Sequence, residues 1–466
     1  MFFHLECIFS QKRYMIAFLA FFGYVNMFCL RANLSMAIVE MTSNKTVVLE
    51  NGTLVRRPEF EWSSQDKGFA LSAFSFGYIF TVVGGLMAAK YGGATVFGVG
   101  IALTALATFL TPYLVYLDFK WFIMSRIVEG IFEAIAFSSM SELWSKWSPP
   151  EERSRLVSYS FTGVYVGLTI SYPISGFVAG IWGWPAIFYT TGGAALIWSV
   201  FWLTLVKNDP ASDRRMSNAE RLFLTERLKN IVKDSEISYP WCDILTSIPV
   251  WTLCIVEFVF SCGYTIIILY LPLYIKDISS IDINQIGILS ALPHLCAVAS
   301  HPIAGYLADY FRNKKILDAT QTHKLYICAG FSIGALLLNV AAFWPNFAGI
   351  IISLSIFRLF TSFSDVAFHV NVIDLSPKYS SLLIGMGTSF FTLGAILSPL
   401  FIGLMVQHHS QEEWNFCFIS FSIIYLFGAA LYWVLGSGKL QSWDKSSASQ
   451  CTNEAEQRND TQMEER

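Results

Sequence analysis

Charged residues are scarce in this chain: they make up 14% of its 466 residues, whereas 54% are hydrophobic and the mean hydropathy is +0.50. This composition excludes an ordinary soluble domain. A helix that crosses a bilayer needs about 20 mostly apolar residues. Twelve such stretches are expected, near residues 14–39, 68–89, 95–117, 121–143, 156–180, 185–206, 246–275, 286–309, 323–344, 348–373, 382–407 and 415–435.

The sequence also lacks the patterns of a cofactor-dependent or metal-dependent enzyme. It has no phosphate-binding loop, no nucleophile constellation and no soluble catalytic segment, and its nine cysteines form no close pairs. His294, His301 and His369 have no metal-ligand spacing and are interpreted as packing or helix-end residues. We therefore expect no enzyme activity, no cofactor and no metal.

Basic residues are unevenly distributed between the connecting segments. About 22 fall on the side of the N-terminus and about six on the other side, and positively charged loops remain cytoplasmic. This bias predicts that both termini are cytoplasmic, and it explains the basic loops without nucleic acid. Asn44 in "NKT" and Asn51 in "NGT" are predicted glycosylation sites in the first non-cytoplasmic loop.

A hydrophilic segment divides the hydrophobic stretches into six and six. The expected organisation is a cytoplasmic N-terminus (1–13), a six-helix bundle (14–206), a cytoplasmic central loop (207–245), a second six-helix bundle (246–435) and a disordered cytoplasmic tail (436–466). The central loop is expected to hold an amphipathic helix starting at Ser217. The halves echo each other, because "GGLMAAKYGGA" and "AGYLADYFRNK" both suggest a Gly-led turn in a short basic loop. Repeated six-span units are typical of secondary transporters.

One apolar stretch carries three charged residues, Arg126, Glu129 and Glu133. Each would cost about 2.5 to 3.5 kcal/mol at the centre of a bilayer, so all three must face protein or water. Their spacing places them on one helix face. Arg126 and Glu129 are expected to pair, and Glu133 is then the acid expected to take up a proton. The alternative is a static network that locks this helix to its neighbours.

Two further groups of charges lie inside apolar stretches. Arg31 has no acid within one turn, so we expect it to receive a substrate carboxylate together with Arg126, unless it reaches to the membrane interface. Tyr78 is a candidate for the same site, or for packing. Arg358 and Asp365 are expected either to partner Glu257 or to form a specificity site of their own.

The loop motifs resemble those of the major facilitator superfamily. Gly305, Asp309 and the basic residues up to Lys315 match its gating-loop signature, whereas Ala89 replaces the Asp in the first-half copy. More narrowly, "RANLSMAIVEM", "FSFGY", "RIVEGIFE", "WSKWSPPEERSRL", "GWPAIFY" and "LSALPHL" are similar to the anion/cation symporter family, which includes sialin, vesicular glutamate transporters and type I sodium/phosphate cotransporters.

This resemblance implies a twelve-helix, all-α membrane protein with the facilitator fold. The acids at Glu129 and Glu133 are sialin-like, while Leu71 and Phe260 replace a His and an Arg of the vesicular glutamate transporters. Asn371 matches a family Asn and is a candidate for lining the substrate path.

The sequence as a whole predicts proton-coupled transport of a small organic anion, an acidic sugar such as sialic acid or an acidic amino acid, by alternating access. The alternatives are sodium-dependent phosphate or organic anion cotransport, and a membrane sensor that does not transport. The expected location is a lysosomal, vesicular or plasma membrane.

Overall fold

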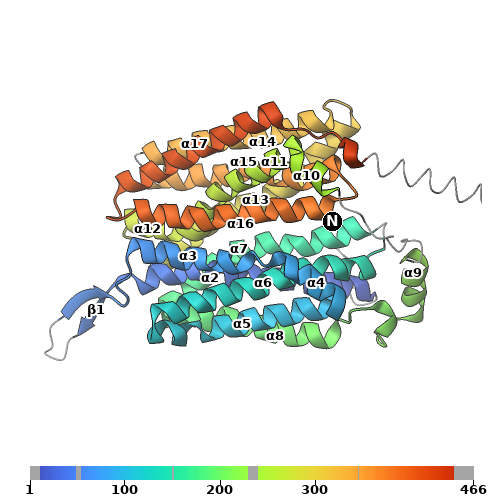
Figure 1. Ribbon diagram of the computed structural model, residues 1–466. Helices are drawn as coiled ribbons and strands as arrows, with labels where there is room; N and C mark the ends of the chain where they lie inside the picture. The colour runs from blue at the N-terminus through green and yellow to red at the C-terminus, as the bar shows by residue number, and fades with distance from the viewer. Residues whose placement is uncertain (1–10, 49–53, 150–151, 229–239, 345, 445–466) are drawn as a thin grey trace, which may run out of the picture.

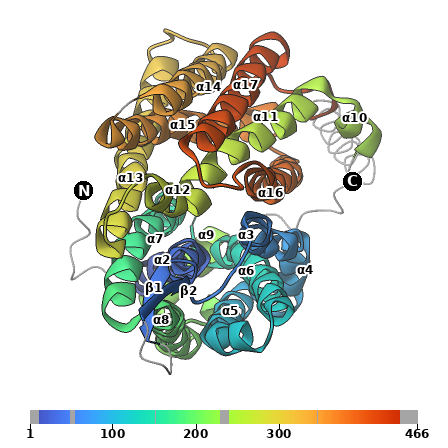
Figure 2. The same cartoon turned by 90° about the vertical axis from the view of Figure 1, so that its left-hand side faces the viewer.

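The computed structural model describes residues 11–48, 54–149, 152–228, 240–344 and 346–444, which form two helical bundles (Figures 1 and 2). The N-terminal half contains α2 (Lys12–Met41), α3 (Ser64–Tyr78), α4 (Thr81–Tyr91), α5 (Gly93–Leu117), α6 (Phe119–Trp147), α7 (Arg153–Trp182) and α8 (Trp184–Leu205). The C-terminal half contains α11 (Ile248–Thr265), the π-helix η2 (Ile266–Tyr270), α12 (Leu271–Ile278), α13 (Ile283–Asn313), α14 (Ala319–Phe343), α15 (Phe347–Leu375), α16 (Ser380–Met405) and α17 (Gln411–Leu435).

The helices confirm the predicted membrane architecture. In the described part of the chain, ten are long and apolar enough to cross a bilayer, or eleven if the bent pair of α3 and α4 forms one span. Helix α6 falls outside this count because its apolar stretch holds three charged residues, Arg126, Glu129 and Glu133. It is nevertheless 29 residues long and lies beside α5 and α3 within its bundle (Figure 1). With α6 included, the helices correspond to the twelve expected stretches.

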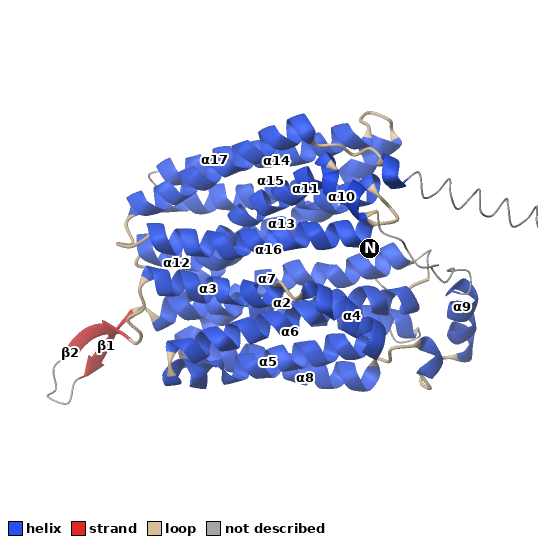
Figure 3. Ribbon diagram, viewed as in Figure 1, coloured by secondary structure: helices blue, strands red, loops and turns tan. Residues whose placement is uncertain are grey.

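Three short helical elements join the halves: the 3₁₀ turn η1 (Pro210–Ser212), α9 (Asn218–Leu228) and α10 (Trp241–Thr246). The expected helix start is confirmed, because the Ser217 hydroxyl accepts a hydrogen bond from the Glu220 amide at 3.2 Å. Figure 3 shows α9 at the opposite end of the molecule from the strands. We call these two ends the linker side and the hairpin side.

Two local expectations differ from the structure. The loop after α2 contains an antiparallel hairpin, β1 (Asn44–Val48) paired with β2 (Leu54–Pro58), which the all-helical prediction did not include. The expected turn at residues 304–314 is also wrong, because α13 continues to Asn313. In the first half the chain turns at Gly92, whose φ of 88° suits glycine, and not at the start of "GGLMAAKYGGA".

A π-helical turn interrupts the seventh span where it faces the N-terminal half. Pro272 cannot give the hydrogen bond that a continuous α-helix would supply to the carbonyl of Ile268. The Tyr172 hydroxyl of α7 donates to this carbonyl at 2.6 Å, so a side chain of one half satisfies the backbone of the other. Such π turns are common at functional sites, and Ile268 lines the cavity described below.

The two halves approach most closely through glycines on the hairpin side. A Cβ atom at Gly403 of α16 would lie 2.7 Å from the Ser64 carbonyl oxygen, and one at Gly287 of α13 would lie 2.5 Å from that of Tyr172. No ion pair joins the two bundles within the described residues. The seam therefore combines close backbone packing with contacts of Ser64 and Lys67 to His409, at 3.4 and 3.5 Å.

Near the linker side, an ionic cluster holds the start of α2 against the segments around it. Arg13 contacts Glu152 at 2.8 Å and Glu220 at 3.2 Å. Partial burial alone would raise the pKa of Glu152, but the hydrogen bonds from Arg13 and Tyr14 outweigh it and lower this pKa below its usual value. Glu152 is therefore more acidic in the folded protein than in the unfolded chain.

This cluster predicts a pH dependence. Because the folded-state pKa of Glu152 is lowered, its stabilising contribution is complete above the unfolded pKa of about 4.3 and is lost as the pH falls from there through the folded pKa. In detergent, Glu152→Gln should unfold at lower temperature than wild type at neutral pH. The difference between the two unfolding temperatures should become smaller below about pH 4. A difference in unfolding temperature that grows as the pH is lowered would contradict this account.

The glycine seam predicts a change in conformation. Gly403→Val should hold α16 away from α3 and reduce several-fold the disulfide formed by Gly180→Cys and Asn284→Cys, two positions that touch across the neighbouring seam. Cross-linking would be measured in membranes, with the reactive native cysteines replaced. Gly385→Val is the matched control on α16, because a Cβ atom there meets nothing within 4 Å. Equal cross-linking in both variants would contradict the prediction.

Candidate functional site: a cationic cavity between the halves

A cavity of about 600 Å³, part of it open space, lies between the two halves. The N-terminal half supplies its cations, Arg31 and Arg126, and the C-terminal half supplies hydroxyl groups and apolar surface. The lining residues are Arg31, Leu34, Leu71, Phe74, Ser75, Tyr78, Arg126, Tyr264, Thr265, Ile268, Leu269, Phe391, Thr392 and Ala395. The structure thus brings three of the four predicted substrate-binding residues, Arg31, Arg126 and Tyr78, to one cavity.

Arg31 of α2 pairs with Glu133 of α6. Its Nε and Nη2 atoms lie 2.8 and 2.5 Å from the same carboxylate oxygen, Oε1. The guanidinium also lies over the rings of Phe28, Phe74 and Tyr78, with 4.4 Å to the centroid of Tyr78. No acid lies within one turn of Arg31 on its own helix, and the structure shows that its partner comes from another helix of the same half. The binding of a substrate carboxylate by Arg31 remains a prediction.

The second oxygen of Glu133 is not used in this pair. Oε2 is buried and has no hydrogen-bond partner among the described residues. A buried carboxylate oxygen without a donor is costly while the group is ionised, because nothing replaces the lost water. Among the described residues, the carboxylate of Glu133 is therefore in direct contact with one cation, Arg31, and on one side only.

Arg126 and Glu129 form the expected ion pair one turn earlier on α6. The contact joins Arg126 Nη1 to Glu129 Oε2, and both side chains are almost completely buried. Thr111 of α5 donates to the other oxygen of Glu129 at 2.9 Å. Since both oxygens of Glu129 have partners, this acid matches the static alternative better than Glu133 does.

The remaining predicted site residues lie elsewhere. Asn371 does not line this cavity, because it is buried in the C-terminal half and donates to the Tyr432 hydroxyl at 2.6 Å. Gly305 and Asp309 lie in the last turns of α13, with Asp309 exposed. Asn44 is exposed at the start of β1, and Asn51 lies outside the described residues. The gating and glycosylation assignments remain predictions.

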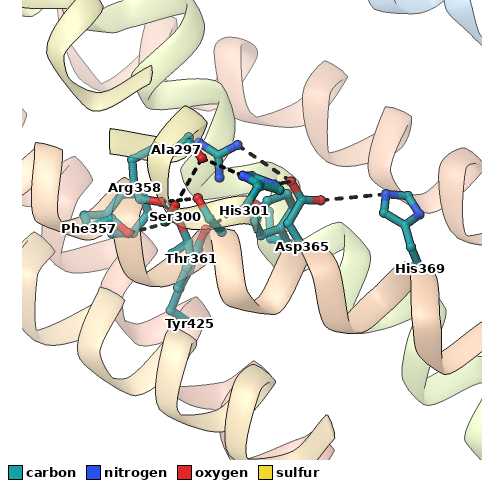
Figure 4. Close-up of polar contacts among 11 residues, drawn as sticks. Ala297, Ser300, His301, Phe357, Arg358, Thr361, Asp365, His369 and Tyr425 are labelled. Atoms are coloured by element: carbon teal, nitrogen blue, oxygen red, sulfur yellow. Dashed lines mark hydrogen bonds and ion pairs between the residues drawn. The ribbon is translucent and has the colours of Figure 1, made fainter. Parts of the chain in front are cut away.

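The C-terminal half holds a second polar cluster (Figure 4). Arg358 lies 3.7 Å from Asp365, which also contacts His301 at 3.0 Å and His369 at 3.9 Å. Glu257, the partner in the first of the two alternatives, makes no hydrogen bond or ion pair with the described residues and interacts with Asp365 only at longer range. The interpretation of His301 as a packing residue is wrong, and its place beside Asp365 could not be inferred from a spacing of 64 residues.

Comparison with known proteins identifies the class of protein. The Major Facilitator Superfamily profile matches residues 16–320 and 253–459. Vesicular glutamate transporter 3 of Danio rerio is 34% identical over 443 residues, which cover 94% of this chain and 75% of that protein. Vesicular glutamate transporter 2 of Homo sapiens is 32% identical over 454 residues, which cover 96% of this chain and 78% of that protein.

Solved structures share the fold at low sequence identity. A bacterial homolog of the human lysosomal transporter Spinster, inward-facing and occupied, aligns with a TM-score of 0.71 and 14% identity over 91% of this chain and 97% of its own. A D-xylose-proton symporter aligns with a TM-score of 0.70 and 15% identity over 92% and 100%. The chain belongs to the major facilitator superfamily. Within it, the chain belongs to the anion/cation symporter family, as its motifs indicated.

The buried pair on α6 predicts a large loss of stability. Glu129→Gln keeps the shape of the side chain and an acceptor for Thr111 but leaves Arg126 without its counter-ion, which should cost about 3 to 5 kcal/mol. Thermal unfolding in detergent would detect this loss. Lys146→Gln is the control, because it removes a half-exposed ion pair of the same helix and should cost less than about 1 kcal/mol. Equal unfolding temperatures for the two variants would contradict the prediction.

Proposed function

We propose that this protein is a secondary active transporter that moves a small organic anion together with a proton by alternating access. Arg31 and Arg126 bind the carboxylate of the substrate, Tyr78 adds a hydroxyl group, and Glu133, with Glu129 beside it, carries the proton. The supporting observation is the one-sided pair of Arg31 and Glu133, in which one carboxylate oxygen has a cation and the other has nothing.

The mechanism is a competition for Arg31. A substrate carboxylate that enters the cavity forms a bidentate contact with the guanidinium and displaces Glu133. Without its counter-ion, the buried Glu133 is stable only in the protonated form. Binding of the anion and uptake of the proton therefore favour each other, as the linkage of two sites requires.

The charges of the cavity favour a single negative charge on the substrate. Arg31, Arg126, Glu129 and Glu133 sum to zero when both acids are ionised, and to one positive charge when Glu133 holds a proton. The opposite wall offers the hydroxyls of Tyr264, Thr265 and Thr392. This combination suits an acidic sugar, such as sialic acid, which has one carboxylate and several hydroxyl groups.

An acidic amino acid is the other candidate substrate. The names of the relatives refer to glutamate, but Leu71 and Phe260 stand at the two positions where our sequence comparison expects a His and an Arg in those transporters. Leu71 lines the cavity and Phe260 packs beside Arg358, so the structure offers apolar surface at these positions. We therefore favour the acidic sugar.

Coupling to a proton also removes an electrical cost. Carrying one negative charge across 100 mV changes the free energy by about 2.3 kcal/mol, and a proton that travels with it cancels this term. We place both termini in the cytoplasm and the protein in a lysosomal, vesicular or plasma membrane. Sodium-driven phosphate or organic anion transport is the rival of the same fold, and a sensor that binds without transport is the rival of another class.

The proposal predicts separate effects for two variants in liposomes. Glu133→Gln should retain exchange of labelled substrate, because Arg31 remains available, but its net uptake should no longer respond to an imposed pH gradient. Arg31→Ala should lose both, because the cation that binds the carboxylate is gone. Labelled sialic acid, glutamate, aspartate and phosphate would each be tested under proton and sodium gradients.

Glu142→Gln is the matched control, since it makes the same chemical change on α6 away from the cavity. Uptake by Glu133→Gln that still follows the pH gradient would show that Glu133 does not carry the proton. Wild-type uptake that follows sodium would support the first rival, and binding without uptake would support the sensor.

A further inference from the structure

The imidazole ring of His301 has a hydrogen-bond acceptor at each of its nitrogens (Figure 4). Nδ1 lies 2.9 Å from the Ala297 carbonyl oxygen, and Nε2 lies 3.0 Å from Asp365 Oδ2. A neutral imidazole has only one N–H group and an ionised carboxylate has none. Both contacts can be hydrogen bonds only if the pair of His301 and Asp365 holds one additional proton.

The charged neighbours favour the proton on the histidine. Arg358 is almost completely buried, and its only ion-pair partner among the described residues is Asp365, at 3.7 Å, so it favours the ionised carboxylate. His369 lies 3.9 Å from the other oxygen of Asp365, and its side chain is 60% exposed. This exposed side chain is the neighbour of the buried carboxylate through which a proton would exchange.

Further titratable groups face this pair. Tyr264 and Glu257 of α11, Tyr425 of α17 and Tyr165 of α7 interact electrostatically with Asp365. His294, on α13 like His301, interacts with Arg358. Glu257 is the only carboxyl group in this set besides Asp365 itself. If Glu257 is ionised, it balances the second cation that a protonated His301 creates next to Arg358.

The pair also lies at the boundary between the halves. The ring of Tyr165, from α7 of the N-terminal half, lies 4.1 Å from the ring of His301, centroid to centroid. An aromatic face stabilises an adjacent cation, here a protonated imidazole. A rocking motion that moves α7 away from α13 at this level would withdraw that face and weaken the binding of the proton.

We propose that His301 and Asp365 form a second proton-binding site, in the C-terminal half, which binds its proton while Tyr165 covers His301 and releases it when the halves separate there. This site deepens the proposed function and rests on it, because it adds a second coupling ion to the same cycle. The two sites differ in what controls the binding of their protons. Substrate binding controls the protonation of Glu133, whereas the relative position of the two halves controls the protonation of His301.

The first test is independent of transport. The full-length protein, labelled with ¹⁵N-histidine and placed in lipid nanodiscs, should show near neutral pH a signal from His301 with both ring nitrogens protonated. That signal should be absent in His301→Gln, and in Asp365→Asn it should change to a neutral ring. If His301 is neutral in wild type and infrared spectra show no protonated carboxyl that Asp365→Asn removes, the site does not exist.

The second test counts protons per substrate in liposomes. His301→Gln and Asp365→Asn should each carry one proton fewer per substrate than wild type while still exchanging substrate. His323→Gln is the matched control, because His323 forms a similar pair with Asp374, at 2.7 Å, near the linker side of the same half. An unchanged proton count in both test variants would overturn the coupling role. If wild type shows no flux, the proposed function fails, and the ¹⁵N spectra alone decide whether the proton site exists.

Discussion

A charge inside a bilayer must have a partner, and the contact between Arg31 and Glu133 meets this requirement for two helices at once. It joins α2 to α6, holds Arg31 beside three aromatic rings and places that cation on the cavity wall. The same contact is incomplete, since Oε2 of Glu133 has no donor. An interaction that leaves one carboxylate oxygen without a donor is one that a bidentate carboxylate can replace.

The buried arginines of each half pair with acids of the same half. Arg31 and Arg126 pair with Glu133 and Glu129 in the N-terminal half, and Arg358 pairs with Asp365 in the C-terminal half. Across the boundary, the described residues meet through close glycine packing, ring contacts, a hydroxyl–carbonyl hydrogen bond and the contact of Lys67 with His409 at 3.5 Å. Such contacts are cheaper to break than buried ion pairs. This division of interactions suits two bodies that must rock against each other without exposing an unpaired charge.

The sequence predicts interactions that lie within one or two helical turns better than those between distant segments. The pair of Arg126 and Glu129 follows from a spacing of three residues, and the cap at Ser217 follows from local hydrogen bonding. The partner of Arg31 is 102 residues away, which no helical period indicates. A match to a family residue does not give the direction of the side chain either. Asn371 was expected to line the substrate path, but its amide points to Tyr432. The helical fold was predictable because each span is a local apolar pattern, whereas the site depends on which faces of different helices meet.

Two proton sites with different controls would give the cycle an order. In the proposed cycle, Glu133 gains its proton when an anion binds Arg31, so its protonation depends on whether the cavity is filled. His301 would keep its proton while Tyr165 covers it, so its protonation would depend on how the halves are placed. Tyr264 lies between the cavity and the cluster of His301 and Asp365. It lines the cavity, and its ring also lies 4.8 Å from the guanidinium of Arg358. An anion that displaces this ring would move the aromatic partner of Arg358 and, through Asp365, change the field at His301. Binding of an anion in the cavity would then change the proton affinity of His301, the site that responds to the movement of the halves. Alternating access requires such a coupling between two sites.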